Sequence, residues 1–396
     1  MKDGRPPRGG PSTQTALALI GLTLLALGGV AIAVGILPVS DALGVGARVW
    51  PVLLFAVAVT VVAELADEAG VFIGVAERLA RIGLGRAWLL WVLLALLAVA
   101  STVFLSLDTT AVLLTPVVVL VARHNGLSPL PFALTAVWLA NTGSLLLPVS
   151  NLTNLLAQHA LGFQDPGRFA ALMAPAALVA VLVPCGVILI VFRRELFRRY
   201  ERAVVTPASD RPLLIAAGGV VALLIPALLT GVPVWIPASV AAVLLAVVFL
   251  VRRRKSLRVG LIPWQLVVFA GGLFLAVEAG HALGLSAVLA TVAGQGEDAG
   301  ALLRLAYSGA IGANAIDNLP AYLALEPVAG SPQRIAALLV GVNAGPLITP
   351  WASLATLLWH RRLTALEVSF PWRRYALLGV IVAPLTVGLA ALALLL

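Results

Sequence analysis

Long apolar runs separated by short polar connectors dominate the pattern of this chain. Runs near the length needed to cross about 30 Å of hydrocarbon recur from Thr15 to Leu396, and no gap between them could hold a soluble domain. The pattern predicts an all-α polytopic membrane protein. We expect membrane spans at residues 15–37, 50–66, 131–158, 169–192, 213–230, 234–251, 264–279, 335–358 and 375–395.

The basic residues set the orientation of these spans. They gather in the short connectors, which the positive-inside rule places on the cytoplasmic side of a cell membrane. The N-terminus is then cytoplasmic and the C-terminus external. The clusters are Lys2 to Arg8, Arg78 to Arg86, Arg123 with His124, Arg193 to Arg202, Arg252 to Arg258, and His360 to Arg374.

Composition excludes several other classes of protein. Of the 396 residues 61% are hydrophobic and only 11% are charged, so the net charge of +9 reflects membrane topology and not nucleic-acid binding. The single Cys185 excludes an intrachain disulfide and a multi-cysteine metal site. The phosphate-binding loop GxxxxGK[ST] and the enzyme motifs HExxH and GxSxG are absent. We therefore expect a lipid-embedded protein that is not an enzyme, with no cofactor.

Two further apolar stretches, residues 88–122 and 300–330, do not fit a single crossing. Arg86 and Arg123 flank the first stretch, so both of its ends belong on the cytoplasmic side, and acidic residues precede the second, which opens to the other face. Neither stretch has the roughly 40 apolar positions that two spans require, so we predict two re-entrant hairpins. Their tips are expected at Ser106 to Thr110 and at Ala315 to Pro320.

The first half of the sequence recurs in the second half. Trp50 to Glu64 and Trp264 to Glu278 share Trp, Phe and Glu at offsets of 0, 5 and 14. NTGSLLLPVSNLTNLL (141–156) aligns without gaps to NAGPLITPWASLATLL (343–358), with seven identities in sixteen positions. The charge rule gives the copies opposite orientations, which predicts an inverted repeat. The expected division is a cytoplasmic N-terminus (1–14), a first repeat (15–192), a cytoplasmic loop with a linker span (193–233) and a second repeat (234–396).

Glycine and proline in these aligned segments are expected to break two spans. Gly143 and Pro148 lie in the first copy, and Gly345 and Pro350 in the second. Backbone at membrane depth can leave the helix only where it is buried in protein or lines a wet cavity. Half-helix ends that meet near the midplane can bind polar solutes or ions. For any single Ser, Thr or Asn here, a role as a contact between helices is the alternative.

Each predicted hairpin tip carries an aspartate, Asp108 or Asp317. An acid near the centre of a membrane segment costs about 2.5–3.5 kcal/mol on insertion scales, so it usually faces a polar cavity and serves ions or protons. We predict these two acids for proton coupling, and no metal ligands. The candidate substrate- or ion-binding residues are Asp108, Thr109, Thr110, Asn141, Gly143, Ser150, Asn151, Asp317, Asn318, Asn343, Gly345, Thr349 and Ser353.

These segments resemble the arsenite/antimonite efflux permeases (ArsB type) of the ion transporter superfamily. The resemblance covers nearly the whole chain and rests on ELADEAGVFIGVAERLAR, LDTTAVLLTPVVV, NTGSLLLPVSNLTNLL, IDNLPAYLALEP and GVNAGPLITPWASLATLLW. It implies two re-entrant hairpins and two broken helices in a mobile region that moves against a scaffold in an elevator-like manner. It also implies efflux of arsenite or antimonite as the neutral trihydroxide, coupled to inward proton movement, with a separate arsenite-stimulated ATPase subunit as partner in some organisms.

Two positions depart from the family pattern. Leu107 stands where the family usually has Asn, and Asp317 adds an acid where the family usually has a second Asn. The added acid leaves the substrate and the proton stoichiometry open. A sodium/proton antiporter of the same superfamily fits two acids well. A dicarboxylate or citrate carrier fits less well, because two acids would repel an anionic substrate.

Overall fold

The computed structural model describes residues 13–200 and 210–396, and these residues form helices joined by short loops. The predicted cytoplasmic N-terminus (1–14) therefore lies almost wholly outside the described residues, as does part of the predicted loop at 193–233. The first half contains α1 (Thr13–Ala33), α2 (Val39–Glu68), α3 (Val71–Ile82), α4 (Ala87–Leu105), α5 (Leu107–Thr109), η1 (Thr110–Leu114), α6 (Thr115–His124), α7 (Leu130–Thr142), η2 (Gly143–Leu145), η3 (Pro148–Ser150), α8 (Leu152–Ala160), α9 (Pro166–Val191) and α10 (Arg193–Leu196).

The second described segment contains α11 (Arg211–Ala227), α12 (Trp235–Arg252), η4 (Arg254–Ser256), η5 (Val259–Leu261), α13 (Trp264–Ala282), α14 (Leu285–Ala293), α15 (Ala299–Ala315), α16 (Asn318–Ala329), α17 (Pro332–Ala344), α18 (Leu354–Ala365) and α19 (Trp372–Ala393).

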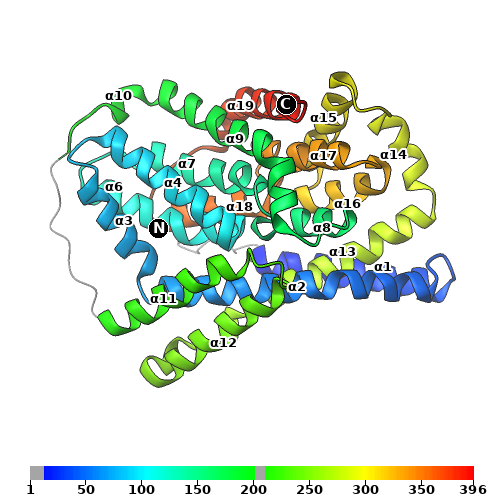
Figure 1. Ribbon diagram of the computed structural model, residues 1–396, viewed down its shortest axis with the longest axis horizontal. Helices are drawn as coiled ribbons and strands as arrows, with labels where there is room; N and C mark the ends of the chain where they lie inside the picture. Colours follow the sequence, from blue (N-terminus) through cyan, green and yellow to red (C-terminus); the bar gives the residue numbers. More distant parts are fainter. Residues whose placement is uncertain (1–12, 201–209) are drawn as a thin grey trace, which may run out of the picture.

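The helices form two regions (Figure 1). A lower layer consists of α1, α2, α11, α12 and α13, and an upper body consists of α4 to α9 and α15 to α19. The short helices α3 and α14 connect the two regions at opposite ends of the molecule (Figure 1). Nearly every residue of α7 and α17 is buried, so these two helices form the centre of the upper body.

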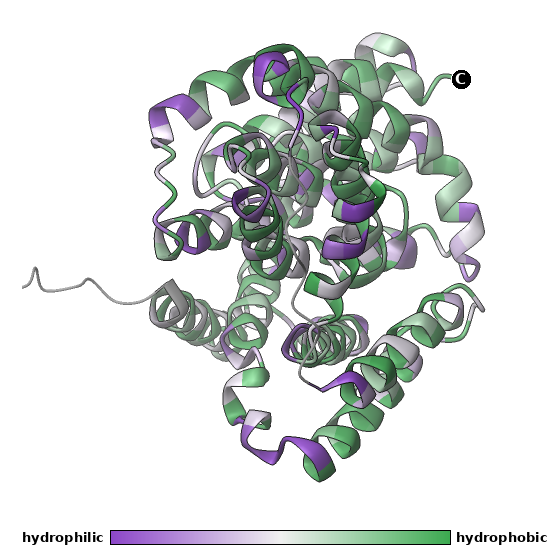
Figure 2. Cartoon of the chain, turned by 90° about the vertical axis from the view of Figure 1, so that its left-hand side faces the viewer, coloured by the Kyte–Doolittle hydropathy of each residue, from purple (hydrophilic) through white to green (hydrophobic). Residues whose placement is uncertain are grey.

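The outer surface is apolar. Within the described residues eight helices are long and apolar enough to cross a membrane. Many of their large apolar side chains face outward; Ile190 on α9 is 73% exposed and Leu377 on α19 is 69% exposed. Figure 2 shows hydrophobic residues along most helices and hydrophilic ones mainly in the connectors. Exposed apolar area on this scale needs lipid around it, which confirms the prediction of a polytopic, all-helical membrane protein.

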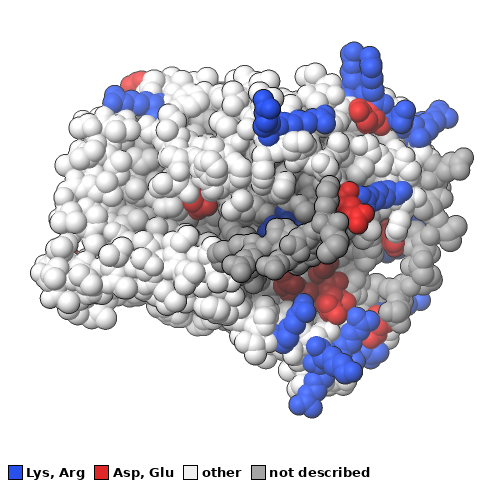
Figure 3. Space-filling model, turned by 180° about the vertical axis from the view of Figure 1, so that it is seen from behind, with Lys and Arg blue, Asp and Glu red and all other residues white. Residues whose placement is uncertain are grey.

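Most Lys and Arg side chains of the described residues gather at one end of the molecule (Figure 3), while the predicted cluster Lys2 to Arg8 lies outside the described residues. Contacts between distant segments show the same arrangement: Arg123 donates to the Glu367 carbonyl, and Arg253 donates to the Glu68 carbonyl. Grouping at one end is what the charge rule requires if all clusters lie on the same side of the membrane. That this end is cytoplasmic remains a prediction.

The length argument for the first hairpin was wrong. Ala87–Leu105 forms α4, of 19 residues, and Leu107–His124 forms a second helical arm of 18 residues, and by length and composition both could cross a membrane. The second arm stays helical through Pro116 because a π-helical turn, η1, precedes it. The matching helices of the second half, α15 and α16, have 17 and 12 residues and are shorter, as expected. The chain does reverse where each tip is predicted, at Ser106 and at Asp317.

The order of elements repeats. Long helix, short helix, paired arms, interrupted helix and long final helix follow each other in α2 to α9 and again in α13 to α19. Gly70 and Gly284, both left-handed with φ of 83° and 95°, precede the short helices α3 and α14, 214 residues apart like Trp50 and Trp264. Packing is reciprocal, since α1 lies on α13 and α12 on α2. Two copies related by a pseudo-twofold axis would pack in this way.

Small residues let α1 approach α13 closely. A Cβ on Gly272 would collide with the Gly21 carbonyl oxygen and lie 2.9 Å from the Leu24 Cβ, whereas a Cβ on Gly271 would have nothing within 4 Å. We expect Gly272→Ala to lower the Tm in detergent, because overpacking a tight interface costs about 1–3 kcal/mol. Gly271→Ala is the matched control. Equal Tm values for the two variants would contradict this packing.

Candidate functional site

The first tip is a sharp reversal stabilised by hydroxyl groups. Ser106 has a φ of 102°, and its side chain accepts a hydrogen bond from the Thr109 amide at 3.4 Å. The Thr110 hydroxyl donates to Ser101 and accepts from Thr102, both at 3.0 Å, which fastens the second arm to α4. The Thr110 hydroxyl therefore already has its hydrogen-bond partners within the protein and holds the tip in place. Asp108 lies between these capping contacts, and its Oδ1 is buried with no partner among the described residues.

The second tip is capped by its own acid. Asp317 precedes α16, and its Oδ1 accepts a hydrogen bond from the Leu319 amide at 3.1 Å. A carboxylate at this position satisfies one of the free amides of the helix start and interacts favourably with the helix dipole. The two acids are thus not equivalent, because Asp317 has a capping role and Asp108 has none.

Both interrupted helices stop where glycine and proline predict a break. The first ends at Thr142 and resumes at Leu152, after Asn151, whose side chain accepts from the Thr153 amide. The second ends at Ala344 and resumes at Leu354, after Ser353. Gly345 allows the close approach there, since a Cβ on it would lie 2.5 Å from the Ala310 Cβ.

A buried amide network joins the two breaks. The Asn343 Oδ1 accepts from Asn151 at 2.9 Å and from the Thr153 hydroxyl at 3.0 Å, and the Asn343 Nδ2 donates to the Asn154 Oδ1 at 3.0 Å. Asn154 in turn donates to the carbonyls of Ser144 and Leu147 within the break, and the Leu147 carbonyl also accepts from the Ser150 amide. Asn343 is 1% exposed, so each of these bonds is shielded from solvent.

Asn314 plays the corresponding part at the second break. Its Nδ2 donates to the Gly345 carbonyl at 2.9 Å, and its Oδ1 accepts from the Thr349 amide at 3.1 Å. The Trp351 indole and the Thr349 hydroxyl both donate to the Asn314 carbonyl. Asn314 therefore ties the second break to the arm that leads to Asp317.

Two adjoining cavities lie between the upper body and the lower layer. The central cavity, of about 490 Å³, is lined by both tips and both breaks and by α1, α2 and α13. The vestibule, of about 430 Å³, shares Thr60, Asp108 and Leu354 with it and extends toward the basic end of the molecule. Asp108 thus stands where the two cavities meet.

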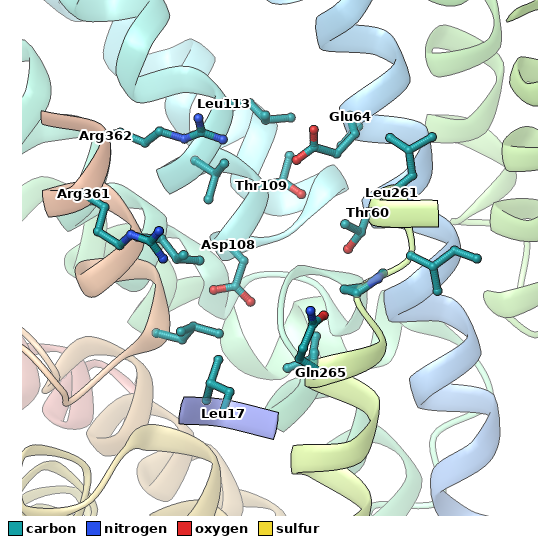
Figure 4. Close-up of a pocket in the computed structure, with 18 of the residues that line it drawn as sticks. Leu17, Thr60, Glu64, Asp108, Thr109, Leu113, Leu261, Gln265, Arg361 and Arg362 are labelled. Atoms are coloured by element: carbon teal, nitrogen blue, oxygen red, sulfur yellow. The ribbon is translucent and has the colours of Figure 1, made fainter. Parts of the chain in front are cut away.

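Charged and polar side chains surround Asp108 in the vestibule (Figure 4). Its carboxylate projects into the cavity, with Arg361 of α18 on one side and Thr60 and Gln265 of the lower layer on the other. Glu64 and Arg362 line the same cavity. Across residues 13–200 and 210–396 no three His, Cys, Asp or Glu side chains come together as a metal site. The arrangement suits a small hydrogen-bonding solute that passes through the vestibule to reach the Asp108 carboxylate.

The predicted site residues separate into two groups. Those that line a cavity are Asp108, Thr109, Asn151, Asp317, Asn318 and Ser353. Those that lie within the protein around the breaks and the first arm are Thr110, Asn141, Gly143, Ser150, Asn343, Gly345 and Thr349. Of the second group, Ser150 donates to the Val103 carbonyl, and Asn141 donates to the Val137 carbonyl of its own helix.

Several cavity and network residues were absent from the predicted set. Asn154 and Asn314 hold the breaks, and Arg361 and Gln265 line the vestibule. Asn314 lies three positions before Asp317, near the end of the arm that leads to the tip. A polar residue so close to a predicted tip could have been included among the candidates. Nothing in the sequence pattern distinguishes Gln265 or Arg361 from ordinary residues at a span end.

Comparisons with known proteins agree over almost the whole chain. The citrate transporter family profile (CitMHS) matches residues 12–359. An arsenical pump membrane protein of Yersinia enterocolitica is 33% identical over 392 residues, covering 91% of this chain and 90% of the relative. Its counterpart in Escherichia coli (strain K12) is 33% identical over 379 residues, covering 87% of this chain and 86% of the relative.

A solved structure shows the same fold. The YdaH transporter of Alcanivorax borkumensis is similar with a TM-score of 0.59 at 17% identity, over 97% of this chain and 98% of that one.

The network around Asn343 makes a prediction about stability. We expect Asn343→Ala to lower the free energy of unfolding, and with it the Tm, more than Asn141→Ala does, because each buried partner left unpaired costs about 1–3 kcal/mol. Asn141 is the matched control, because it aligns with Asn343 but donates only within its own helix. Thermal unfolding of both purified variants in the same detergent measures the difference. A larger loss at Asn141 would mean that the network does not join the breaks.

Proposed function

Because the chain belongs to the arsenical pump membrane protein family, within the wider citrate transporter family, we propose that it exports arsenite and antimonite by secondary transport driven by inward proton movement. It is a membrane transporter and not an enzyme. Asp108 carries the proposal: its Oδ1 has no partner within the described parts of the chain, and it borders both the central cavity and the vestibule.

The chemistry of the central cavity suits the neutral trihydroxide of arsenic or antimony. Each hydroxyl of such a solute can donate and accept, and the cavity offers the carboxylate of Asp108, the amides of Asn151 and Asn318 and the hydroxyl of Ser353. The starts of α8, α16 and α18 lie beside these residues and add the partial positive charge of helix N-termini. No cysteine is needed for this mode of binding.

Coupling to protons is assigned to Asp108 and Asp317. The export of a neutral solute against its gradient needs a coupled ion, and a carboxylate in a wet cavity of a membrane protein is the usual carrier of a proton. Both acids line the central cavity, so a proton and a substrate would occupy the same place. A sodium/proton antiporter is the second candidate, and the presence of two acids in one cavity favours it.

Alternating access is proposed to follow an elevator-like movement of the upper body against the lower layer, with two inverted repeats and two re-entrant hairpins. The repeated order of elements and the reciprocal packing of α1 with α13 and α12 with α2 support this proposal. So does the position of the connecting helices α3 and α14 at opposite ends of the molecule. The vestibule gives the conformation described here an opening toward the basic end.

One ion pair links the two regions away from that opening. Arg48 of α2 donates to Glu326 of α16 at 2.6 Å. Arg48 precedes Glu64 by 16 residues on the same helix, which places the pair about 24 Å from the vestibule residue. An upper body that moves along the lower layer has to break this contact. The aligned position in the first half, 209 residues earlier, holds Val117, so the ion pair has no counterpart there.

The acids provide the first test of transport. We expect Asp108→Asn and Asp317→Asn to abolish proton-driven arsenite accumulation in everted vesicles, since each loses the group that carries the proton. Loss of a hydrogen bond to a charged group costs about 1.5–3 kcal/mol, or about 10–100-fold in affinity. Asparagine caps helices as well as aspartate does, so a loss at position 317 would not reflect unfolding.

Glu297→Gln is the matched control, because Glu297 is exposed in the loop before α15. Normal proton-driven accumulation by both aspartate variants would refute the assignment of the acids. Collapse of a pH gradient by sodium without arsenite transport would replace the proposed function by sodium/proton exchange.

The ion pair between the regions provides the second test. We expect Glu326→Gln to reduce the share of molecules with an open vestibule, because it weakens a contact present in that state. The measurement is labelling of Gln265→Cys by a membrane-impermeant maleimide in a Cys185→Ala background. Asp210→Asn, which weakens the Arg252–Asp210 pair between α11 and α12 of the lower layer, should leave labelling unchanged. Unchanged labelling in Glu326→Gln would count against the pair as a link between moving regions.

A further inference from the structure

The central cavity has two unlike walls. The upper body contributes the polar side chains of both tips and both breaks, set among apolar residues such as Leu107, Leu152 and Ile316, and we call this side the polar wall. The lower layer contributes only one polar lining residue in the part of the chain that the structure describes, Thr60 of α2. Its other lining residues are apolar and include Ile20, Leu24, Phe55, Val59, Phe269 and Leu273.

The cavity is large for an inorganic trihydroxide. Its volume of about 490 Å³ lies in the range of pockets that hold drug-sized organic ligands, which also combine apolar walls with a few polar groups. Arsenite has four heavy atoms and, at about 30 Å³ for each water-sized group, fills about 120 Å³. A trihydroxide bound at the polar wall would leave most of the apolar wall uncovered.

The polar wall offers several hydrogen-bonding groups that have no partner among the described residues. Among the described residues, the Asp108 Oδ1 and the Ser353 Oγ are buried without a partner, and both residues line this cavity. The Asp317 Oδ1 already accepts from the Leu319 amide, and the Asn151 Nδ2 already donates to Asn343. Asn318 lines the same wall, and its side-chain amide has no hydrogen-bond partner among the described residues. Two hydroxyl groups therefore find partners at this wall, whereas a group directed at the opposite wall meets an apolar surface.

We propose, on the basis of the proposed function, that the central cavity takes trivalent arsenicals with one apolar organic group, R–As(OH)₂. The two hydroxyls bind at Asp108 and Ser353, and the organic group packs on Phe55, Phe269 and Leu273 of the lower layer. An aromatic substituent suits this wall, because rings pair favourably with phenylalanine at short range. In inorganic arsenite the third hydroxyl would face the apolar wall without a partner.

The test compares two substrates in everted vesicles, arsenite and phenylarsenite, with accumulated arsenic measured by mass spectrometry. The uptake measured in vesicles that carry Asp108→Asn is subtracted from the uptake in wild-type vesicles, which corrects for passive diffusion of each substrate. We expect the KM for phenylarsenite to be at least about tenfold below that for arsenite, since one methylene-sized apolar contact alone discriminates by about tenfold or more. Phenylarsenite transport no better than arsenite transport would overturn the proposal and leave the proposed function standing.

A pair of variants on α2 locates the organic group. Ala56 lines the central cavity, so Ala56→Phe should fill the apolar side and raise the KM for phenylarsenite at least about tenfold, with arsenite transport retained. Leu54→Phe is the control, because Leu54 is 36% exposed on the same helix and does not line the cavity. Retained arsenite transport shows that the variant folds.

The remaining outcomes decide between the two proposals. If Ala56→Phe lowered the transport of arsenite and of phenylarsenite equally, the apolar wall would serve only as the surface along which the upper body moves. That result would refute the organic-group site. Transport of neither substrate by the wild-type protein would refute the proposed function itself, and the substrate class with it.

Discussion

Backbone that leaves a helix inside the hydrocarbon must find its hydrogen bonds within the protein, and this constraint governs the structure. Each interrupted helix meets it with an asparagine. Asn154 donates to the carbonyls of Ser144 and Leu147 within the first break, and Asn314 pairs with the Gly345 carbonyl and the Thr349 amide at the second. Because side-chain amides carry both donors and acceptors, they can replace the missing backbone partners without bringing a charge into the membrane.

The same amides fix the site. Asn343 connects the second break to Asn151 and Thr153 of the first, so the two halves of the upper body meet through buried hydrogen bonds and not through apolar contact alone. The network occupies groups behind the cavity, whereas the Asp108 Oδ1 and the Ser353 Oγ, in two residues that line the cavity, have no partner among the described residues. The opposite wall carries no comparable network, because the helices of the lower layer are continuous where they line the cavity and their backbone is already satisfied.

Sequence pattern predicts the features that depend on composition and spacing. The lengths of the apolar runs predict the helices, Gly143 with Pro148 predicts the break in the first interrupted helix, and Asp317 marks the second tip. It does not predict which polar side chains face the cavity, because that depends on rotation about a helix and on the partner helix. Asn141 and Asn343 align in sequence, yet one donates within its own helix and the other crosses to the opposite half. The length of the first hairpin's second arm was misjudged for a related reason, since a π-helical turn precedes Pro116 and the arm stays helical beyond it.

Asp317 shows how a transporter fold can vary its chemistry without losing stability. Asp and Asn are about equally good caps, and either can accept the Leu319 amide hydrogen bond that starts α16. The fold therefore constrains the acceptor oxygen at this position and leaves the charge free to change. The arm behind it is held separately, by Asn314. A tip built in this way allows the charge in the central cavity to differ among relatives while the helices that form the cavity stay the same.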